Sequence, residues 1–202
     1  MCTGHRRRVL LTALAALATM AVLGGCSHGH THSATSSSGA SATASEANPA
    51  GDIPDTQVYV PFTSPDGVFT VSVPEGWARS ADGNATVFTD KTNSVRLESV
   101  PQPSAPTLDS VKTQELPAIA AATSGYQPGA VSVVQRKAGP GVLATYWVTS
   151  APNPVTGKTV TDAVERYEFW HAGHTAIITL SGPVGADNVD PWMTITNSPQ
   201  WR

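Results

Sequence analysis

Three histidines near the N-terminus carry the side chains best suited to bind a metal ion. His28, His30 and His32 alternate with other residues, so an extended backbone places all three imidazoles on one side. Imidazole binds Zn, Cu and Ni, and three imidazoles on one side form an open facial site. The alternative is that they are ordinary polar residues of a low-complexity segment, where ordering on binding costs entropy. Metal binding at these histidines is therefore one hypothesis for the chain.

Cys26, two residues before the first histidine, is a candidate for lipid attachment. The stretch Leu23-Gly24-Gly25-Cys26 resembles a bacterial lipobox, in which the thiol is acylated and the chain is then cut before the cysteine. Upstream, Arg6–Arg8 precede an uncharged run over residues 9–23, as in a secretory signal. This run is too short and too rich in alanine for a membrane span. We expect residues 1–25 to be a lipoprotein signal peptide; the alternative is a plain secretory signal that contains a cysteine.

Removal of residues 1–25 sets the charge and thiol content of the mature chain. It leaves nine Lys and Arg against fifteen Asp and Glu, a formal net charge of −6, and Cys26 as the only cysteine. This balance argues against nucleic acid as a partner, because nucleic-acid binding requires a basic patch. It also argues against electrostatic attachment to anionic lipid, so acyl chains must provide the anchor. We expect a protein held by lipid on the extracytoplasmic face of the cell membrane.

Two further histidines lie close together near the C-terminus. His171 and His174 flank Ala172-Gly173, which is typical of a tight hairpin turn. A structural or catalytic metal site needs at least one more ligand, and none follows from the spacing, so we interpret them as polar residues at a hairpin end. The sequence contains no Gly-x-Ser-x-Gly elbow, no phosphate-binding glycine loop and no His-Glu-x-x-His. We expect neither enzymatic activity nor a cofactor, with a hydrolase that pairs His171 or His174 with a serine as a less favoured alternative.

The stretch 165–170 alternates charged and aromatic residues. In a strand, one face carries Glu165, Tyr167 and Phe169, and the other carries Arg166, Glu168 and Trp170. A buried acid here would be a candidate for a functional site. The pattern predicts an aromatic core face and a charged, partly solvated opposite face.

Composition divides the mature chain into a tether and a domain. Residues 26–51 are dominated by Ser, Ala, Thr, Gly and His, which cannot bury enough apolar surface to fold, so we expect the lipidated Cys26 to be followed by a disordered tether. Residues 52–202 contain all five tryptophans and are long enough for one globular domain.

Period-two patterns dominate this domain. They predict eight strands, at 57–63, 68–73, 86–89, 94–100, 131–136, 143–150, 164–171 and 174–181. A helix is predicted over 107–123, capped by Thr107 and kinked at Pro117. A second is predicted to begin at Asp190-Pro191, with Asp187 and Asp190 as caps rather than calcium ligands, since a calcium loop has a regular spacing that is absent here. The order of elements predicts an α+β fold, a mostly antiparallel sheet with packed helices.

Three stretches resemble a known group of proteins. Residues 69–77, FTVSVPEGW, resemble the opening of the PsbP-like group, which includes actinobacterial lipoproteins and the eukaryotic Ran-binding Mog proteins. Residues 163–170, AVERYEFW, and 185–192, GADNVDPW, are similar to uncharacterised actinobacterial lipoproteins. The resemblance covers about residues 57–201 and implies an α/β/α sandwich around an antiparallel sheet. It also implies an accessory or partner-binding role and transfers no catalytic residue.

The leading functional hypothesis is a lipid-anchored envelope lipoprotein that binds another protein or an apolar ligand. Trp77 and Trp170 are its candidate contact residues. The alternatives are a metal-binding lipoprotein that uses His28, His30 and His32, and the hydrolase named above.

Overall fold

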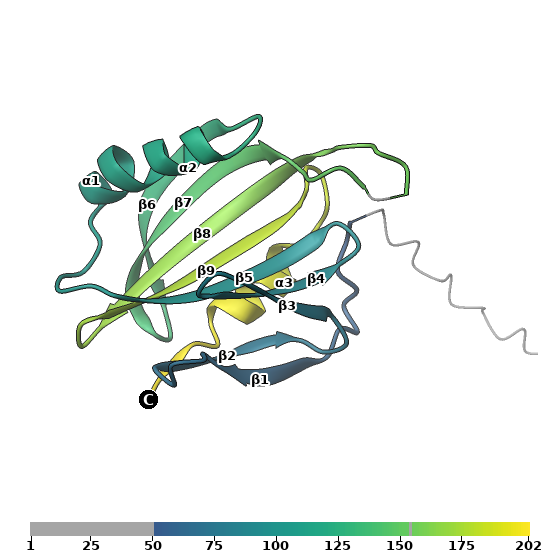
Figure 1. The fold of residues 1–202 in the computed structure, drawn as a ribbon. Helices are drawn as coiled ribbons and strands as arrows, with labels where there is room; N and C mark the ends of the chain where they lie inside the picture. Colours follow the sequence, from purple (N-terminus) through teal and green to yellow (C-terminus); the bar gives the residue numbers. More distant parts are fainter. Residues whose placement is uncertain (1–50, 154) are drawn as a thin grey trace, which may run out of the picture. The chain divides into compact units, whose positions relative to one another are not determined.

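Antiparallel strands make up most of the domain (Figure 1). The computed structural model describes residues 51–153 and 155–202. The strands are β1 (Tyr59–Thr63), β2 (Phe69–Pro74), β3 (Ala78–Asp82), β4 (Ala85–Asp90), β5 (Asn93–Pro101), β6 (Gln127–Arg136), β7 (Gly139–Thr149), β8 (Thr161–His171), β9 (His174–Pro183) and β10 (Gln200–Trp201). The predictions of a signal peptide, of lipidation at Cys26, of a metal-binding histidine tract and of nearly all of the tether concern residues outside the described ones.

The strands form two sheets. The larger has seven strands in the order β3-β4-β5-β9-β8-β7-β6, and the smaller has three in the order β1-β2-β10. Close packing dictates the residue type where β7 meets β8: a Cβ on Gly141 would lie 2.7 Å from Cδ1 of Phe169. Only glycine therefore lets the buried Phe169 ring lie against this point of the sheet.

Helices cover both faces of the large sheet. One face carries a continuous helical segment of α1 (Leu108–Ser110), the π-helical turn η1 (Val111–Glu115) and α2 (Leu116–Ala122). The other face carries α3 (Val189–Thr196) beside the small sheet (Figure 1). The predicted antiparallel α+β sandwich is confirmed.

Two apolar cores hold these layers together. The larger core joins α3 and the small sheet to the large sheet, and its fully buried members include Phe69, Phe169, Ile178 and Ile195. The smaller core lies under the helical segment, around Val111, Leu116, Val142, Ala144, Tyr146 and Val164. Trp192 and Ile195 of α3 share the buried face that their spacing predicts.

The long helix has the predicted cap and an unpredicted π-helical turn. The Thr107 hydroxyl accepts a hydrogen bond from the Ser110 N–H at 3.0 Å, and the Ser110 hydroxyl accepts one from the Thr107 N–H at 2.9 Å. The π-helical turn η1 ends at Glu115, two residues before Pro117, which has no N–H and whose ring would clash with the carbonyl four residues earlier in a regular α-helix. The sequence predicted a kink of the helix at Pro117. The structure has a wider, π-helical turn before the proline instead.

The predicted caps of the last helix are wrong. α3 begins at Val189, so Asn188 occupies the N-cap position and Asp190 is the second helical residue. The Asn188 side chain makes no cap, because its Oδ1 accepts from the Ile53 N–H at 2.8 Å and its amide donates to the Gly51 carbonyl at 3.1 Å. Asp187 is exposed, and its own N–H donates to Asp52. The N-cap asparagine thus anchors residues 51–53.

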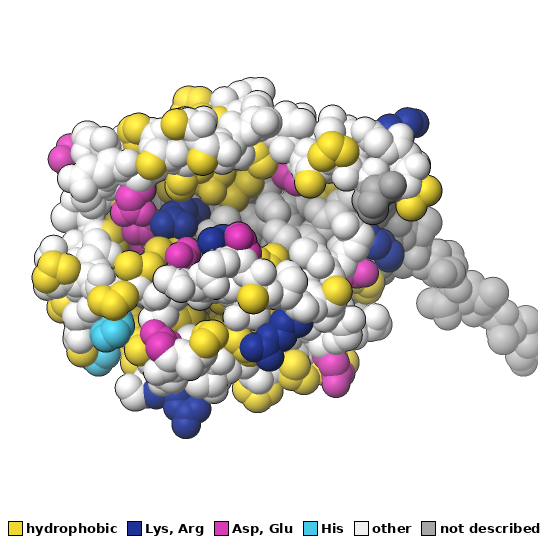
Figure 2. All heavy atoms as spheres, viewed as in Figure 1, with side chains coloured by type: hydrophobic (Ala, Val, Ile, Leu, Met, Phe, Trp, Pro, Cys, Tyr) yellow, Lys and Arg dark blue, Asp and Glu magenta, His cyan; other side chains and the backbone are white. Residues whose placement is uncertain are grey.

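The face of the large sheet under α1–α2 is hollowed. Figure 2 shows acidic and basic side chains gathered between the helical layer and strands β4 and β5. Among the described residues, Arg96 forms ion pairs with Asp82 and Glu98, and Arg166 forms ion pairs with Glu115 and Glu168. Within residues 51–153 and 155–202, no helix has both the length and the apolar character needed to cross a bilayer.

Candidate functional site

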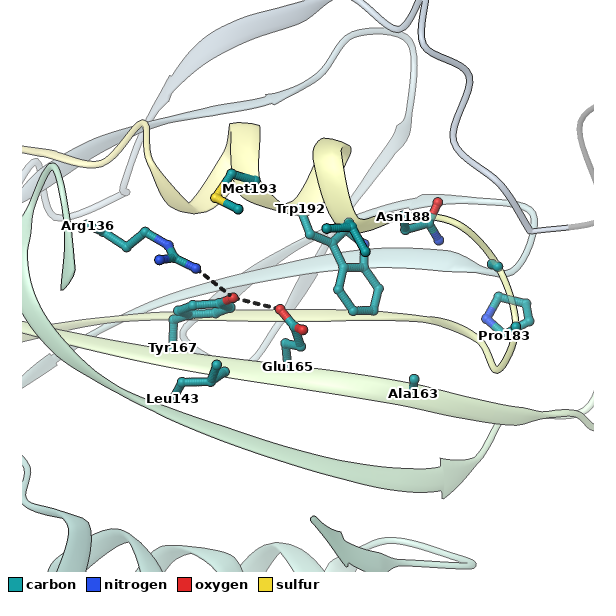
Figure 3. Close-up of a pocket in the computed structure, with 12 residues that line it drawn as sticks. Arg136, Leu143, Ala163, Glu165, Tyr167, Pro183, Asn188, Trp192 and Met193 are labelled. Atoms are coloured by element: carbon teal, nitrogen blue, oxygen red, sulfur yellow. Dashed lines mark hydrogen bonds between the residues drawn. The ribbon is translucent and has the colours of Figure 1, made fainter. Parts of the chain in front are cut away.

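A pocket of about 260 Å³ lies between α3 and the large sheet (Figure 3). We call it the α3 pocket. Its sheet side comes from alternate residues of β8 together with Leu143 of β7, and its other side comes from α3 and the residues just before it. The lining residues used below are Arg136, Leu143, Ala163, Glu165, Tyr167, Trp192 and Met193.

Side-chain sizes explain why the space is open. Trp192 points from α3 toward the sheet, where it faces the small Ala163 on β8 (Figure 3). Trp192 is 9% exposed, whereas Met193, which also lines the pocket, is 41% exposed. Met193 therefore lies at the mouth of the α3 pocket, and Trp192 lies in its interior. A hollow with apolar walls open to solvent on one side is the usual form of a ligand site.

Three polar side chains form a hydrogen-bonded chain at one end of the α3 pocket. The Tyr167 hydroxyl donates to Oε2 of Glu165 at 2.7 Å and accepts from Nη2 of Arg136 at 3.4 Å. The Arg136 guanidinium also lies 5.4 Å from the centre of the Tyr167 ring, in cation–π contact. Burial, and next the Glu165 carboxylate, raise the pKa of Tyr167 to about 12. Tyr167 therefore keeps its proton at neutral pH and acts as a hydrogen-bond donor.

Arg136 retains hydrogen-bonding capacity for a ligand. Its guanidinium donates to both Tyr167 and Thr196 at 3.4 Å, in long and therefore weak bonds, and to the carbonyl of the adjacent Gln135 at 3.2 Å. It makes no ion pair among the described residues. A guanidinium with weakly held donors at the end of an apolar pocket can receive an acceptor or an anionic group.

A buried acid occupies the opposite face of the same strand. Glu168 is 2% exposed, and its Oε1 accepts from Nε of Arg166 at 2.8 Å. Nη2 of Arg166 also donates to Oε2 of Glu115 in η1, at 3.0 Å. Burial and the Glu115 carboxyl raise the pKa of Glu168, against the lowering effect of Arg166. This ion-pair cluster links the helical segment to β8.

The predicted partly solvated character of this face is therefore wrong at Glu168. Alternation assigned the residues to the correct faces, since Tyr167 and Phe169 belong to the larger core. It could not show that the helical segment over residues 108–122 covers the second face of β8 as well. The sequence does contain one signal of the buried charges: a charged residue lies on each side of Tyr167, in a strand rich in aromatic residues.

The two tryptophans predicted as contact residues lie apart from the α3 pocket. Trp77 packs on the larger core, and its indole N–H donates to Oε1 of Gln57 at 3.3 Å. Trp170 is half-buried, and its N–H donates to the Gln102 carbonyl at 2.8 Å. Neither residue lines the α3 pocket, so their contact role stays a prediction. The tryptophan that lines the α3 pocket is Trp192 of α3.

The two C-terminal histidines face each other across the hairpin, as predicted. His171 pairs with His174 in the register of β8 and β9, and the His171 ring stacks on Trp201 with centres 5.3 Å apart. In the part of the chain that the structure describes, no three His, Cys, Asp or Glu residues are grouped to hold a metal.

The chain matches no protein-family model and no curated protein sequence. It is similar in structure to cyanobacterial PsbP (CyanoP) from Synechocystis, with a TM-score of 0.50 and 13% identity over 77% of this chain and 100% of that one. The Ran-binding protein Mog1p of Saccharomyces cerevisiae gives a TM-score of 0.48 and 11% identity, over 72% of this chain and 96% of that one. The similarity to CyanoP shows that the fold is PsbP-like.

Two further structures give lower scores or cover only part of the neighbour. LpqN of Mycobacterium tuberculosis, which is involved in cell envelope biogenesis, gives a TM-score of 0.38 at 14% identity, over 72% of this chain and 91% of that one. A Bacteroides thetaiotaomicron protein gives 0.48 at 16% identity over 70% of this chain, which spans only 48% of that one.

Proposed function

We propose that this protein is a lipid-anchored envelope lipoprotein whose PsbP-like domain is a non-enzymatic binding module. The α3 pocket receives an apolar group of a partner protein or of a small ligand. The observation that carries the proposal is the α3 pocket itself, in which Leu143, Ala163 and Trp192 form apolar walls and Arg136 places donors at one end. Mostly apolar pockets with a few polar groups at defined positions are typical of binding sites.

The size and chemistry of the α3 pocket favour binding over catalysis. Its volume of about 260 Å³ exceeds the roughly 150 Å³ cavity that holds a benzene molecule. A general acid or base needs a pKa near the operating pH, and Tyr167, with a pKa of about 12, does not meet this requirement. The polar chain from Arg136 to Glu165 is therefore suited to orient a bound group.

The envelope location in the proposal is supported by the sequence of residues 1–26. A basic start, an apolar run and Leu23-Gly24-Gly25-Cys26 together form the pattern of an acylated signal. The net charge of −6 after residue 25 leaves no basic surface excess for anionic lipid, which makes the acyl chains the anchor.

Photo-crosslinking from the mouth of the α3 pocket tests this function. Met193, at 41% exposure, is replaced by benzoylphenylalanine in the full-length chain, which is then irradiated in its own envelope. We expect an adduct, and its mass identifies a partner protein or a small ligand. Val58, which is 56% exposed and outside the α3 pocket, serves as the control position and should give no such adduct.

A variant that fills the α3 pocket makes the test specific. Ala163→Phe places a ring in the pocket and should abolish the Met193 adduct, whereas Ala81→Phe on the exposed strand β3 should leave it unchanged. Thermal unfolding of both variants checks that they are folded. An adduct that survives Ala163→Phe in folded protein, or the absence of any adduct specific to position 193, would contradict the proposal.

A further inference from the structure

A second hollow, of about 500 Å³, lies at one end of the sheet face opposite the α3 pocket. It opens between the turn that joins β4 to β5 and the residues that follow β7. Asp162 and the α3 pocket residue Ala163 are consecutive in β8, so their side chains project to opposite faces. The residues of this hollow used below are Lys91, Ser94, Lys158, Asp162 and Ser181.

Asp162 in this hollow is a buried acid, and one of its carboxylate oxygens has no hydrogen-bond partner among the described residues. It is 7% exposed, and its Oδ1 is buried and accepts no hydrogen bond from the described residues. Its cross-strand neighbours are Val148 on β7 and Pro183 on β9, and neither side chain has a donor. Burial raises the pKa of Asp162. A buried acceptor left without a donor costs free energy, so this position needs a physical explanation.

The groups around Asp162 are hydroxyls and cations. Ser94 and Ser181 lie on neighbouring strands, with their hydroxyl oxygens 2.7 Å apart, and both line the hollow. Lys91 and Lys158 line it from exposed positions, and neither forms an ion pair with Asp162. The hollow therefore combines one strong acceptor, hydroxyls that both donate and accept, and positive charge at its rim.

We propose that this hollow is a binding site for a saccharide, with Asp162 accepting hydrogen bonds from its hydroxyls and the two lysines favouring an acidic substituent. A ligand for Asp162 must bring donors, which excludes a purely apolar group. An ammonium group also donates, but Lys91 and Lys158 would repel it. A ring of hydroxyl groups supplies donors without positive charge. This proposal is independent of the α3 pocket and of its ligand.

Three sugars of matched size test the class of ligand. Glucose, glucuronate and glucosamine differ in carrying no charge, a carboxylate and an ammonium group, and each is titrated into the full chain while amide shifts are followed by NMR. We expect glucuronate to bind most tightly and glucosamine most weakly, with shifts confined to the end of β4, the turn into β5, the start of β5, the segment between β7 and β8, the start of β8 and the end of β9. Replacing both lysines (K91Q and K158Q) should remove the preference for glucuronate over glucose.

Substitutions at Asp162 test the contact itself. Asp162→Asn should weaken binding of all three sugars by about tenfold or more, because a charged acceptor is lost. Asp162→Leu should abolish binding and leave the protein folded, since no internal partner loses its bond. Asp55→Asn, at an exposed position outside the hollow, should bind as the unmodified chain does. No binding of any sugar, tightest binding of glucosamine, or affinities unchanged in Asp162→Asn would overturn the proposal.

Discussion

Glu168 shows how one buried side chain can make the stability of the whole domain depend on pH. It is 2% exposed and lies between Arg166 and the helical segment. Burial and the Glu115 carboxyl raise its pKa to about 8 from an ordinary 4.5. The folded protein therefore holds a proton that the unfolded chain has released, and this contribution to stability is lost as the pH rises from 4.5 through 8.

Glu168→Gln removes this titration. Glutamine keeps an oxygen that can accept from Arg166 and gains an amide that can donate to Glu115, so we expect stability near that of the unmodified protein at pH 5. At pH 8 the variant should be more stable, by about 1–3 kcal/mol. Urea unfolding at the two pH values measures the difference. Glu75→Gln, at an exposed position, should retain the original pH profile, and parallel profiles for both variants would contradict the argument.

The hairpin between β8 and β9 is the clearest case in which one substitution in a local element should stabilise the protein. Both turn residues have positive φ, 46° at Ala172 and 88° at Gly173, as a type I′ turn requires. This conformation is costly for alanine and free for glycine. Ala172→Gly should raise the free energy of unfolding by about 0.5–1 kcal/mol, as measured by urea unfolding.

The same substitution in a helix is the matched control. Ala118 is exposed in α2, where glycine is unfavourable, so Ala118→Gly should lower stability by about 0.5–1 kcal/mol. Equal effects of the two substitutions on the free energy of unfolding would show that the conformation of residue 172 does not cause the change in stability.

At the level of elements, the sequence predicted those strands whose residues follow an alternating pattern. All eight predicted strands are confirmed, and β6 and β7 differ most, since they begin at Gln127 and Gly139 rather than at Val131 and Leu143. β3 has no such signal, because all five of its residues are exposed. β10 is only two residues long and exists through its pairing with β2. These two edge strands therefore escape prediction by periodicity, because pairing with a neighbouring strand and not an alternating pattern defines them.

The α3 pocket could not be predicted because its residues are brought together only by the fold. Arg136 ends β6, Tyr167 lies in β8 and Trp192 lies in α3, so no short spacing relates them. The sequence did predict that Tyr167 and Trp192 lie on apolar faces, and both residues are buried in the larger core. What it lacked was the position of α3 over β8, and that position depends on packing between distant segments.

At the scale of the whole molecule, the proposed attachment to the membrane is tested by Cys26→Ala. The chain after residue 25 has a net charge of −6, so without acyl chains it has neither an apolar anchor nor electrostatic attraction to anionic lipid. We expect Cys26→Ala to move the protein from the membrane fraction to the soluble fraction or the medium, as followed by fractionation and immunoblotting. Cys2→Ala changes the other cysteine, which lies in the predicted signal, and should leave the protein with the membrane. If Cys26→Ala still fractionates with membranes after a high-salt wash, the anchor is not a lipid on this thiol, and the envelope location would need another cause.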